Sequence, residues 1–176
     1  MKRLFYQLLM PVGIIIMVCS VSSCKKTMLT SDAEPNNSSA NAKDRAIPNF
    51  NLEVILRGNG KAFGLVKFRQ DVNPTKIVTL DTWVRDLLPN HSYKLQRAID
   101  TNLDGNCTGT NWLTLGKGPT SQLIYTDENG TGREDLWRKL TAQSGTKFDI
   151  HFRVIDASSS SVVVVLTSDC YQFTVR

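Results

Sequence analysis

The stretch Phe148-Asp149-Ile150-His151-Phe152-Arg153-Val154 decides the fold class, because apolar and polar side chains alternate along it without a break. Successive side chains of a β-strand point to opposite faces of a sheet, so a period of two is typical of a half-buried strand. The stretch therefore predicts a strand with its four apolar side chains towards a core and its three polar side chains on the other face.

The same alternation recurs in the upstream half of the chain. Residues 50–57 and 62–68 predict two strands on either side of Gly58-Asn59-Gly60, where Gly and Asn tolerate the positive φ of a hairpin turn. After a polar loop at 71–75, residues 76–84 predict a third strand.

The downstream half predicts shorter strands between turn sequences. The segment 134–142 is ambiguous, because Leu136, Trp137 and Leu140 have helical spacing, but the run is short and we expect a strand with a turn. The continuous apolar run 162–166 is typical of a central strand. Further strands are expected at 93–99, 112–115, 123–126 and 171–175. About eight strands without a clear helix predict one domain, an antiparallel Greek-key β-sandwich over 49–176.

The first 23 residues have the order of charge and hydrophobicity of an export signal: Lys2 and Arg3, then an apolar core, then small residues. The sequence Val21-Ser22-Ser23-Cys24 resembles the lipobox of bacterial lipoproteins. The resemblance implies that the leader 1–23 is cleaved and that Cys24 carries lipid. An ordinary secretory signal and a retained anchor are the alternatives, although the apolar run falls short of the roughly 20 residues that a membrane span needs.

Residues 24–48 are rich in Ser, Thr and Asn and poor in large apolar side chains, so they predict a disordered, flexible linker. Lys25 rather than Asp follows Cys24. By resemblance to lipoprotein sorting in diderm bacteria, this implies an extracytoplasmic protein that is anchored in the outer membrane, with membrane lipid as its partner through Cys24.

The net charge of +5 does not indicate nucleic-acid binding. Lys2, Arg3, Lys25 and Lys26 lie outside the predicted domain, and no basic run interleaves with aromatic residues. We therefore expect no nucleic-acid partner.

The four cysteines have separate expected roles. Cys19 lies in the leader, and Cys24 is the lipid site. Cys107 and Cys170 remain as an even pair in an exported chain, so we expect a disulfide between them, with two free thiols as the alternative.

The spacing Leu87-x-Pro89-x-x-x-Tyr93 resembles the corner of Greek-key sandwiches, where a Tyr hydroxyl bonds to upstream backbone. A long loop with Cys107 follows the corner, and Cys170 precedes the last strand. This order of features resembles the Cu,Zn superoxide dismutase-like sandwich and the related CHRD domain, in which a disulfide has the same position. A fibronectin type III-like sandwich shares the corner and is the alternative.

The resemblance does not extend to the metal ligands or to any other catalytic group. That family binds copper and zinc through several histidines, including His-x-His after the corner, whereas residues 93–97 contain none. His91 and His151 are the only histidines of the chain, too few for a copper or zinc site. Ser158 to Ser161 follow Asp156, but no Gly-x-Ser-x-Gly motif is present. We therefore expect no enzyme and no required cofactor.

Two patterns leave a binding role open. Asp100-x-Asn102-x-Asp104-Gly105 matches the start of a calcium loop, but Asn111 stands where a bidentate Glu is usual, so a turn capped by Asx side chains is the alternative. Four aromatic residues are candidates for a sugar-binding platform or for sandwich packing. These are Trp83, Trp112, Tyr125 and Trp137.

The expected function is thus a non-enzymatic, membrane-anchored lipoprotein with a binding or envelope-structural role and a protein or glycan partner. A calcium-dependent or aromatic-platform module for carbohydrate binding or adhesion is the first alternative. A metal-dependent, dismutase-like enzyme is the second.

Overall fold

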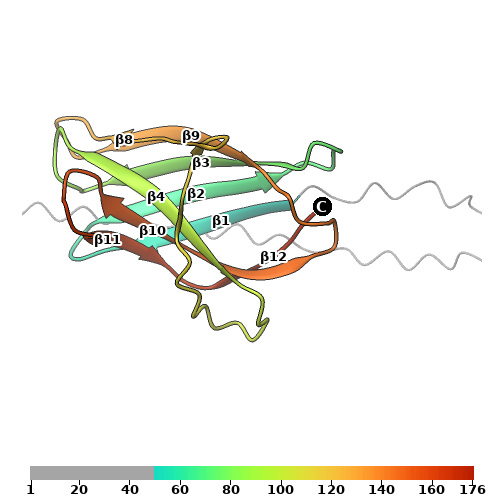
Figure 1. Ribbon diagram of the computed structural model, residues 1–176. Coiled ribbons are helices and arrows are strands. Elements are labelled where there is room, and N and C mark those ends of the chain that lie inside the picture. The colour runs from blue at the N-terminus through green and yellow to red at the C-terminus, as the bar shows by residue number, and fades with distance from the viewer. Residues whose placement is uncertain (1–49) are drawn as a thin grey trace, which may run out of the picture. The chain divides into compact units, whose positions relative to one another are not determined.

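The computed structural model describes residues 50–176, which form an all-β domain without a helix in that part of the chain (Figure 1). This confirms the predicted fold class. The predictions for the leader 1–23, for Cys24 and for the linker 24–48 lie outside the described residues. Nowhere in residues 50–176 is there a helix of the length and apolar character needed to cross a membrane.

Seven strands have five or more residues, and five are shorter. The long strands are β1 (Phe50–Arg57), β2 (Phe63–Gln70), β3 (Ile77–Arg85), β4 (Ser92–Asp100), β9 (Gly132–Lys139), β10 (Lys147–Asp156) and β11 (Val164–Ser168). The short strands are β5 (Leu113–Thr114), β6 (Gly116–Lys117), β7 (Thr120–Ser121), β8 (Ile124–Tyr125) and β12 (Tyr171–Thr174). The ambiguous segment 134–142 is largely strand, as expected.

The strands pair almost all the way around the domain. β1, β2, β3 and β9 are consecutive antiparallel neighbours, and β4, β10 and β11 continue on the other side until β11 pairs with β1. β4 and β9 are not paired directly. The short strands lie between them, since β5 and β8 pair with β4, and β6 pairs with β9. The result is a nearly closed, sandwich-like barrel with a seam between β4 and β9 (Figure 1).

The alternating apolar side chains of the long strands fill the interior. On β3, for example, every second residue from Val78 to Val84 is buried. Phe68 of β2 packs edge-to-face on Phe173 at 4.8 Å and on Phe152 at 6.0 Å between ring centroids, which joins opposite walls of the domain. Full burial of such side chains contributes about 1.5–3 kcal/mol each.

The apolar run 162–166 is a central strand only in part: β11 lies between β10 and β1, as predicted, but the first valines of the run are outside it. β11 begins only at Val164, and Val162, Val163 and Val164 are 63%, 42% and 41% exposed. The reason is pairing: β11 meets β1 only at Leu56 and Arg57, and its ladder with β10 is irregular next to Ile155. The first valines therefore extend beyond the sheet that would cover them.

The Leu87–Tyr93 corner connects β3 to β4. The Tyr93 hydroxyl accepts a 3.0 Å hydrogen bond from the backbone N–H of Leu88. The Thr126 hydroxyl also donates to the Leu88 carbonyl at 2.6 Å and accepts from the His91 N–H at 3.0 Å. These bonds hold the corner against the turn between β8 and β9.

The predicted disulfide is confirmed. Cys107 and Cys170 are bonded, with their Cα atoms 5.4 Å apart, so the loop after β4 is joined to the residue before β12. Under this loop lies Asp149, which is fully buried and accepts a 2.8 Å hydrogen bond from the Gly105 N–H. The polar face of β10 is therefore partly covered and not open to solvent.

Candidate functional site

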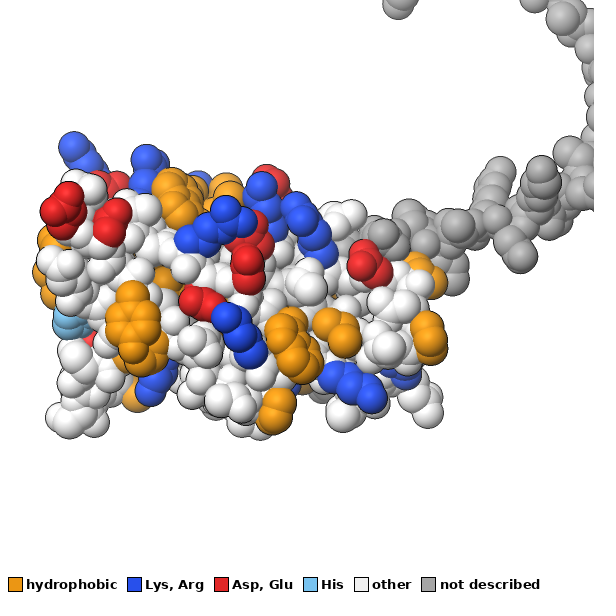
Figure 2. Space-filling view, turned by 90° about the horizontal axis from the view of Figure 1, so that it is seen from above, with side chains coloured by type: hydrophobic (Ala, Val, Ile, Leu, Met, Phe, Trp, Pro, Cys, Tyr) orange, Lys and Arg blue, Asp and Glu red, His pale blue; other side chains and the backbone are white. Residues whose placement is uncertain are grey.

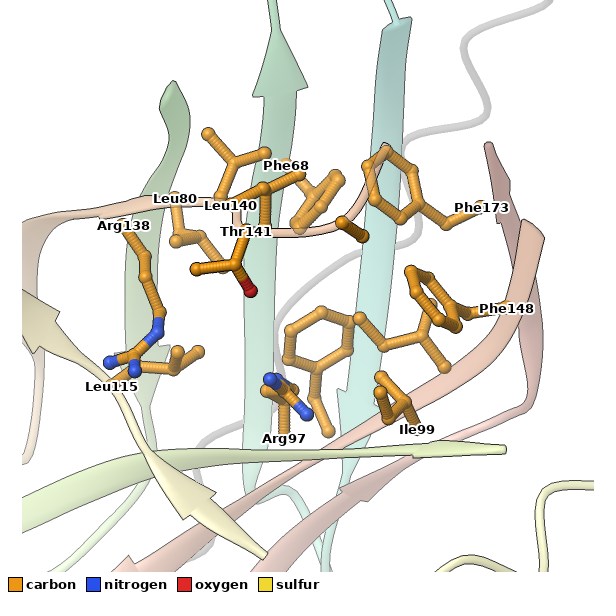
Figure 3. Close-up of a pocket in the computed structure, with 14 residues that line it drawn as sticks. Phe68, Leu80, Arg97, Ile99, Leu115, Arg138, Leu140, Thr141, Phe148 and Phe173 are labelled. Carbon is orange, nitrogen blue, oxygen red and sulfur yellow. The ribbon is translucent and has the colours of Figure 1, made fainter. Parts of the chain in front are cut away.

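A pocket opens at the seam, next to the connection from β9 to β10 (Figure 3). Its volume is about 120 Å³. The walls are mainly apolar and aromatic, and they come from both halves of the sheet, with Phe68 on β2, Phe148 and Phe152 on β10 and Phe173 on β12. The pocket exists because β4 and β9 separate here and no short strand bridges them at this end.

Two arginines line this apolar pocket. Arg97 on β4 follows the buried Tyr93 and Leu95 in the alternation, and Arg138 on β9 follows the buried Leu136. Both guanidinium groups thus start from positions that face the interior, and both residues are half-buried. Figure 3 shows the two guanidinium groups on the side of the pocket opposite Phe68 and Phe173.

The two guanidinium groups have no counter-charge among residues 50–176. Within that range neither Arg97 nor Arg138 takes part in a hydrogen bond or a salt bridge with another side chain. Burial lowers the pKa of Arg97, and the neighbouring positive charge of Arg138 lowers it further. Half-buried charges without a partner are costly, so this site attracts negative charge.

The composition of the pocket favours binding over catalysis. None of its fourteen lining residues is an acid, a histidine or a cysteine. Thr141 adds one hydroxyl, whose oxygen points into the pocket in Figure 3. The wall therefore offers apolar contact, positive charge and one hydroxyl, and no group that would act as a general base.

The proposed calcium loop is a hydrogen-bonded turn. Asp100 accepts from the Asn102 N–H at 3.0 Å and from the Thr108 hydroxyl at 2.7 Å. Asp104 accepts from the Asn106 N–H at 2.9 Å and from the Asn102 amide at 2.6 Å. The Thr108 hydroxyl, with backbone donors, lowers the pKa of Asp100. These are the contacts of Asx turns, the alternative that the sequence left open.

The structure adds one acid to this region that the sequence analysis did not select. Asp149 lies directly opposite Asp100 in the ladder of β10 and β4, and its Oδ1 atom is buried without a hydrogen-bond partner. In residues 50–176, however, no three His, Cys, Asp or Glu side chains are grouped as a metal site requires.

His91, Asp156 and Ser158 form a cluster at the opposite end of the domain. Asp156 Oδ1 accepts from His91 Nε2 at 2.9 Å and from the Ser158 hydroxyl at 2.7 Å. Ser158 Oγ also lies 3.1 Å from the same Nε2 atom. A catalytic relay needs the acid and the serine on different ring nitrogens, so this cluster does not have the geometry of a nucleophilic triad. His151 is separate, with its Nε2 3.1 Å from the Gly109 carbonyl oxygen.

The structure does not bring the four aromatic candidates together. Trp112 packs between the His151 ring, at 4.6 Å, and the Arg153 guanidinium, at 3.9 Å, against β10. Trp83 and Trp137 point outward from β3 and β9, with the Asp81–Arg133 ion pair between them in the ladder. Figure 2 shows hydrophobic side chains as separate spots among charged ones on the face seen there.

In comparisons with known proteins, no family model, no curated protein and no solved structure matches this chain.

The sequence contains a signal for the pocket in the alternation of two strands. In 93–99, Arg97 occupies a place that the alternation assigns to an apolar residue, and Arg138 does the same between Leu136 and Leu140. A charged residue at a core-facing position in two strands indicates a site, but only the strand order shows that the two positions face one pocket.

Proposed function

We propose that this protein is a lipid-anchored, extracytoplasmic binding protein, and that it binds a small apolar molecule in the pocket at the seam. The observation that carries the proposal is the pocket itself. It has aromatic walls, it opens between β4 and β9, which are not paired with each other, and no acid, histidine or cysteine lines it. Ligand sites are usually concave and mostly apolar, with a few polar groups that orient the ligand.

The location is supported by the order of the N-terminal sequence. A charged start, an apolar core and Val21-Ser22-Ser23-Cys24 are the features of a lipoprotein leader. The Cys107–Cys170 disulfide is typical of proteins exported to an oxidising compartment. With two or three acyl chains on Cys24, the membrane anchor would be stable, because one chain alone binds only marginally.

The family likeness is part of the same proposal. Around the barrel, β9 lies between the consecutive strands β3 and β4, and β4 lies between the consecutive strands β9 and β10. Connections that skip a strand in this way support a Greek-key arrangement. The corner at Tyr93 and the disulfide between the long loop and the last strand support a likeness to dismutase-like and CHRD sandwiches. The copper and zinc chemistry is not part of the proposal, since the ligands are absent from the sequence.

The anchor is tested by growing expressing cells with a labelled fatty acid. We expect label on the wild-type chain and none on Cys24→Ala, which should appear in the soluble extracytoplasmic fraction. Label retained on Cys24→Ala would refute lipidation at this residue. Cys19→Ala is the matched control, and it should keep the label.

Binding is tested on the full mature chain with Cys24→Ala, in buffer without detergent. We expect phenyl compounds with short side chains to raise the melting temperature, and Ala142→Phe, which fills the pocket, to abolish the rise. Gln143→Phe adds the same ring at an exposed neighbouring position and should leave binding unchanged. An equal rise in both variants would place the ligand elsewhere and refute the site.

A further inference from the structure

We propose that the ligand of this pocket is a small organic anion, with an apolar body of about one aromatic ring and an acidic head group held by Arg97 and Arg138. This inference rests on the proposed function and names its ligand class. It is carried by three observations: the uncompensated charge, the size of the apolar space and the position of the polar groups on its wall.

In the ligand-free protein the two guanidinium charges lack a counter-charge within residues 50–176. Arg97 and Arg138 start from interior-facing positions on two strands that are not paired with each other. A nearby anion would offset the desolvation cost of each half-buried guanidinium. Among residues 50–176 no carboxylate bonds to either guanidinium. Two other arginines of the domain do have partners: Arg133 pairs with Asp81, and Arg153 donates to Gln96 and stacks on Trp112.

The volume of the pocket limits the size of the apolar part of the ligand. An engineered apolar cavity of about 150 Å³ binds benzene, so a pocket of about 120 Å³ accommodates roughly one ring and not a long acyl chain. Phe68 and Phe173 already pack edge-to-face, and Phe148 and Phe152 line the same space. The ring of the ligand can add further edge-to-face contacts with these side chains.

The polar groups fix the orientation of the ligand. Arg97 and Arg138 lie across the pocket from Phe68 and Phe173, and the Thr141 hydroxyl points into the space between them (Figure 3). A guanidinium presents a planar fork of N–H donors that matches the two oxygens of a carboxylate or the oxygens of a phosphate. The ring of the ligand would thus point inward and its acidic group towards the arginines.

The experiment compares compounds that share one ring and differ in charge. The full mature chain with Cys24→Ala is titrated by calorimetry at pH 7 with 3-phenylpropanoate, benzyl phosphate, neutral 3-phenylpropanamide and cationic 3-phenylpropylamine. We expect at least one anion to bind about tenfold or more tightly than the amide, the amine to bind weakest, and added salt to weaken only the anions. Which anion binds better identifies the head group.

Variants assign the effect to the two arginines. Arg97→Met and Arg138→Met should each weaken anion binding roughly 10- to 100-fold and leave amide binding unchanged, because a hydrogen bond to a charged group contributes about 1.5–3 kcal/mol. Arg69→Met removes the same charge from an exposed position on β2 and should change nothing. Binding of the neutral amide reports that each variant is folded. If Arg97→Met does not fold, Arg97→Lys is the second variant, because it keeps the charge and loses the planar guanidinium.

The outcomes separate this inference from the proposed function. Equal binding of amide and anions, or unchanged anion binding by both Met variants, would overturn the anion inference and leave an apolar binding pocket. Binding of none of the four compounds would overturn both.

Discussion

Tyr93 and Leu88 are joined across five residues of chain by a 3.0 Å hydrogen bond, from the Leu88 backbone N–H to the Tyr93 hydroxyl. The Tyr93 side chain is 1% exposed. Burial raises the pKa of Tyr93, while the hydrogen bond from the Leu88 N–H lowers it. The bond fixes the direction in which the chain leaves β3 and enters β4, the strand that carries Arg97.

Tyr93→Phe should therefore destabilise the domain. The substitution keeps the buried ring and leaves the Leu88 N–H without its acceptor, which costs about 1 kcal/mol of unfolding free energy. Urea unfolding followed by tryptophan fluorescence measures the loss. Tyr125→Phe is the control, because that ring is 64% exposed, and it should have almost no effect. Equal stability of Tyr93→Phe and wild type would mean that the corner bond contributes nothing.

The disulfide should contribute more than any single hydrogen bond. It closes a loop of 63 residues, for which the chain-entropy model gives about 4 kcal/mol, with measured values of typically 2–4 kcal/mol. We expect the double variant Cys107→Ser with Cys170→Ser to melt at a clearly lower temperature. Amide exchange should also rise at Gly105 and Gly109, whose loop would lose its tie to Cys170. A double variant with wild-type melting and wild-type exchange would contradict this role.

The cluster around Asp156 should make stability depend on acid pH. Hydrogen bonds from Ser158 and His91 lower the pKa of Asp156 to about 2, below the ordinary value of about 3.9. Because the pKa is lower in the folded state, the carboxylate stabilises the fold above pH of about 4, and the contribution is lost as pH falls towards 2.

The measurement is the difference in unfolding free energy between wild type and Asp156→Asn from pH 6 to pH 2. We expect a constant difference above pH of about 5 and a smaller one at each step below pH of about 4. Asp135→Asn, at an exposed position outside this cluster, serves as the matched control and should give a flat difference. A flat difference for Asp156→Asn as well would contradict the hydrogen-bonded carboxylate.

The strands were predictable because their signal is local. Alternation along 50–57, 76–84 and 148–154 depends only on neighbouring residues, and the buried positions of β3 follow it residue by residue. The apolar run 162–166 is a central strand only from Val164 onward, for a non-local reason: its burial depends on how far β1 and β10 extend beside it, and they do not reach Val162.

The candidate site was not predictable from the sequence for a similar reason. Arg97 and Arg138 are separated by 41 positions, and they share a pocket only because β4 and β9 border one seam. The loop with Asp100 and Asp104 is different, because its residues are close in sequence and its spacing is compatible with a calcium loop and with an Asx turn. In the structure the two carboxylates accept hydrogen bonds from the same loop. Local spacing could not distinguish these two uses of one motif.

In the ligand-free protein, Arg97 should lower stability. Its guanidinium is partly desolvated and lies near the like charge of Arg138, and both effects lower its pKa. Arg97→Met keeps much of the side-chain volume and removes the charge, so we expect the free energy of unfolding to rise by about 1 kcal/mol, as when buried charges are replaced by apolar groups. Arg138→Met should have an effect of the same sign.

The double variant distinguishes mutual repulsion from simple desolvation. Each single substitution already removes the repulsion between the two charges, so the double variant should gain less than the sum of the two single variants. Chemical denaturation of the four proteins at low ionic strength measures this coupling, which should shrink in high salt. Arg69→Met, at an exposed position, should give no gain. Additive gains would contradict a repulsive pair and leave desolvation as the cost of each charge. A loss of stability in both single variants would imply that the arginines have a stabilising partner in the free protein.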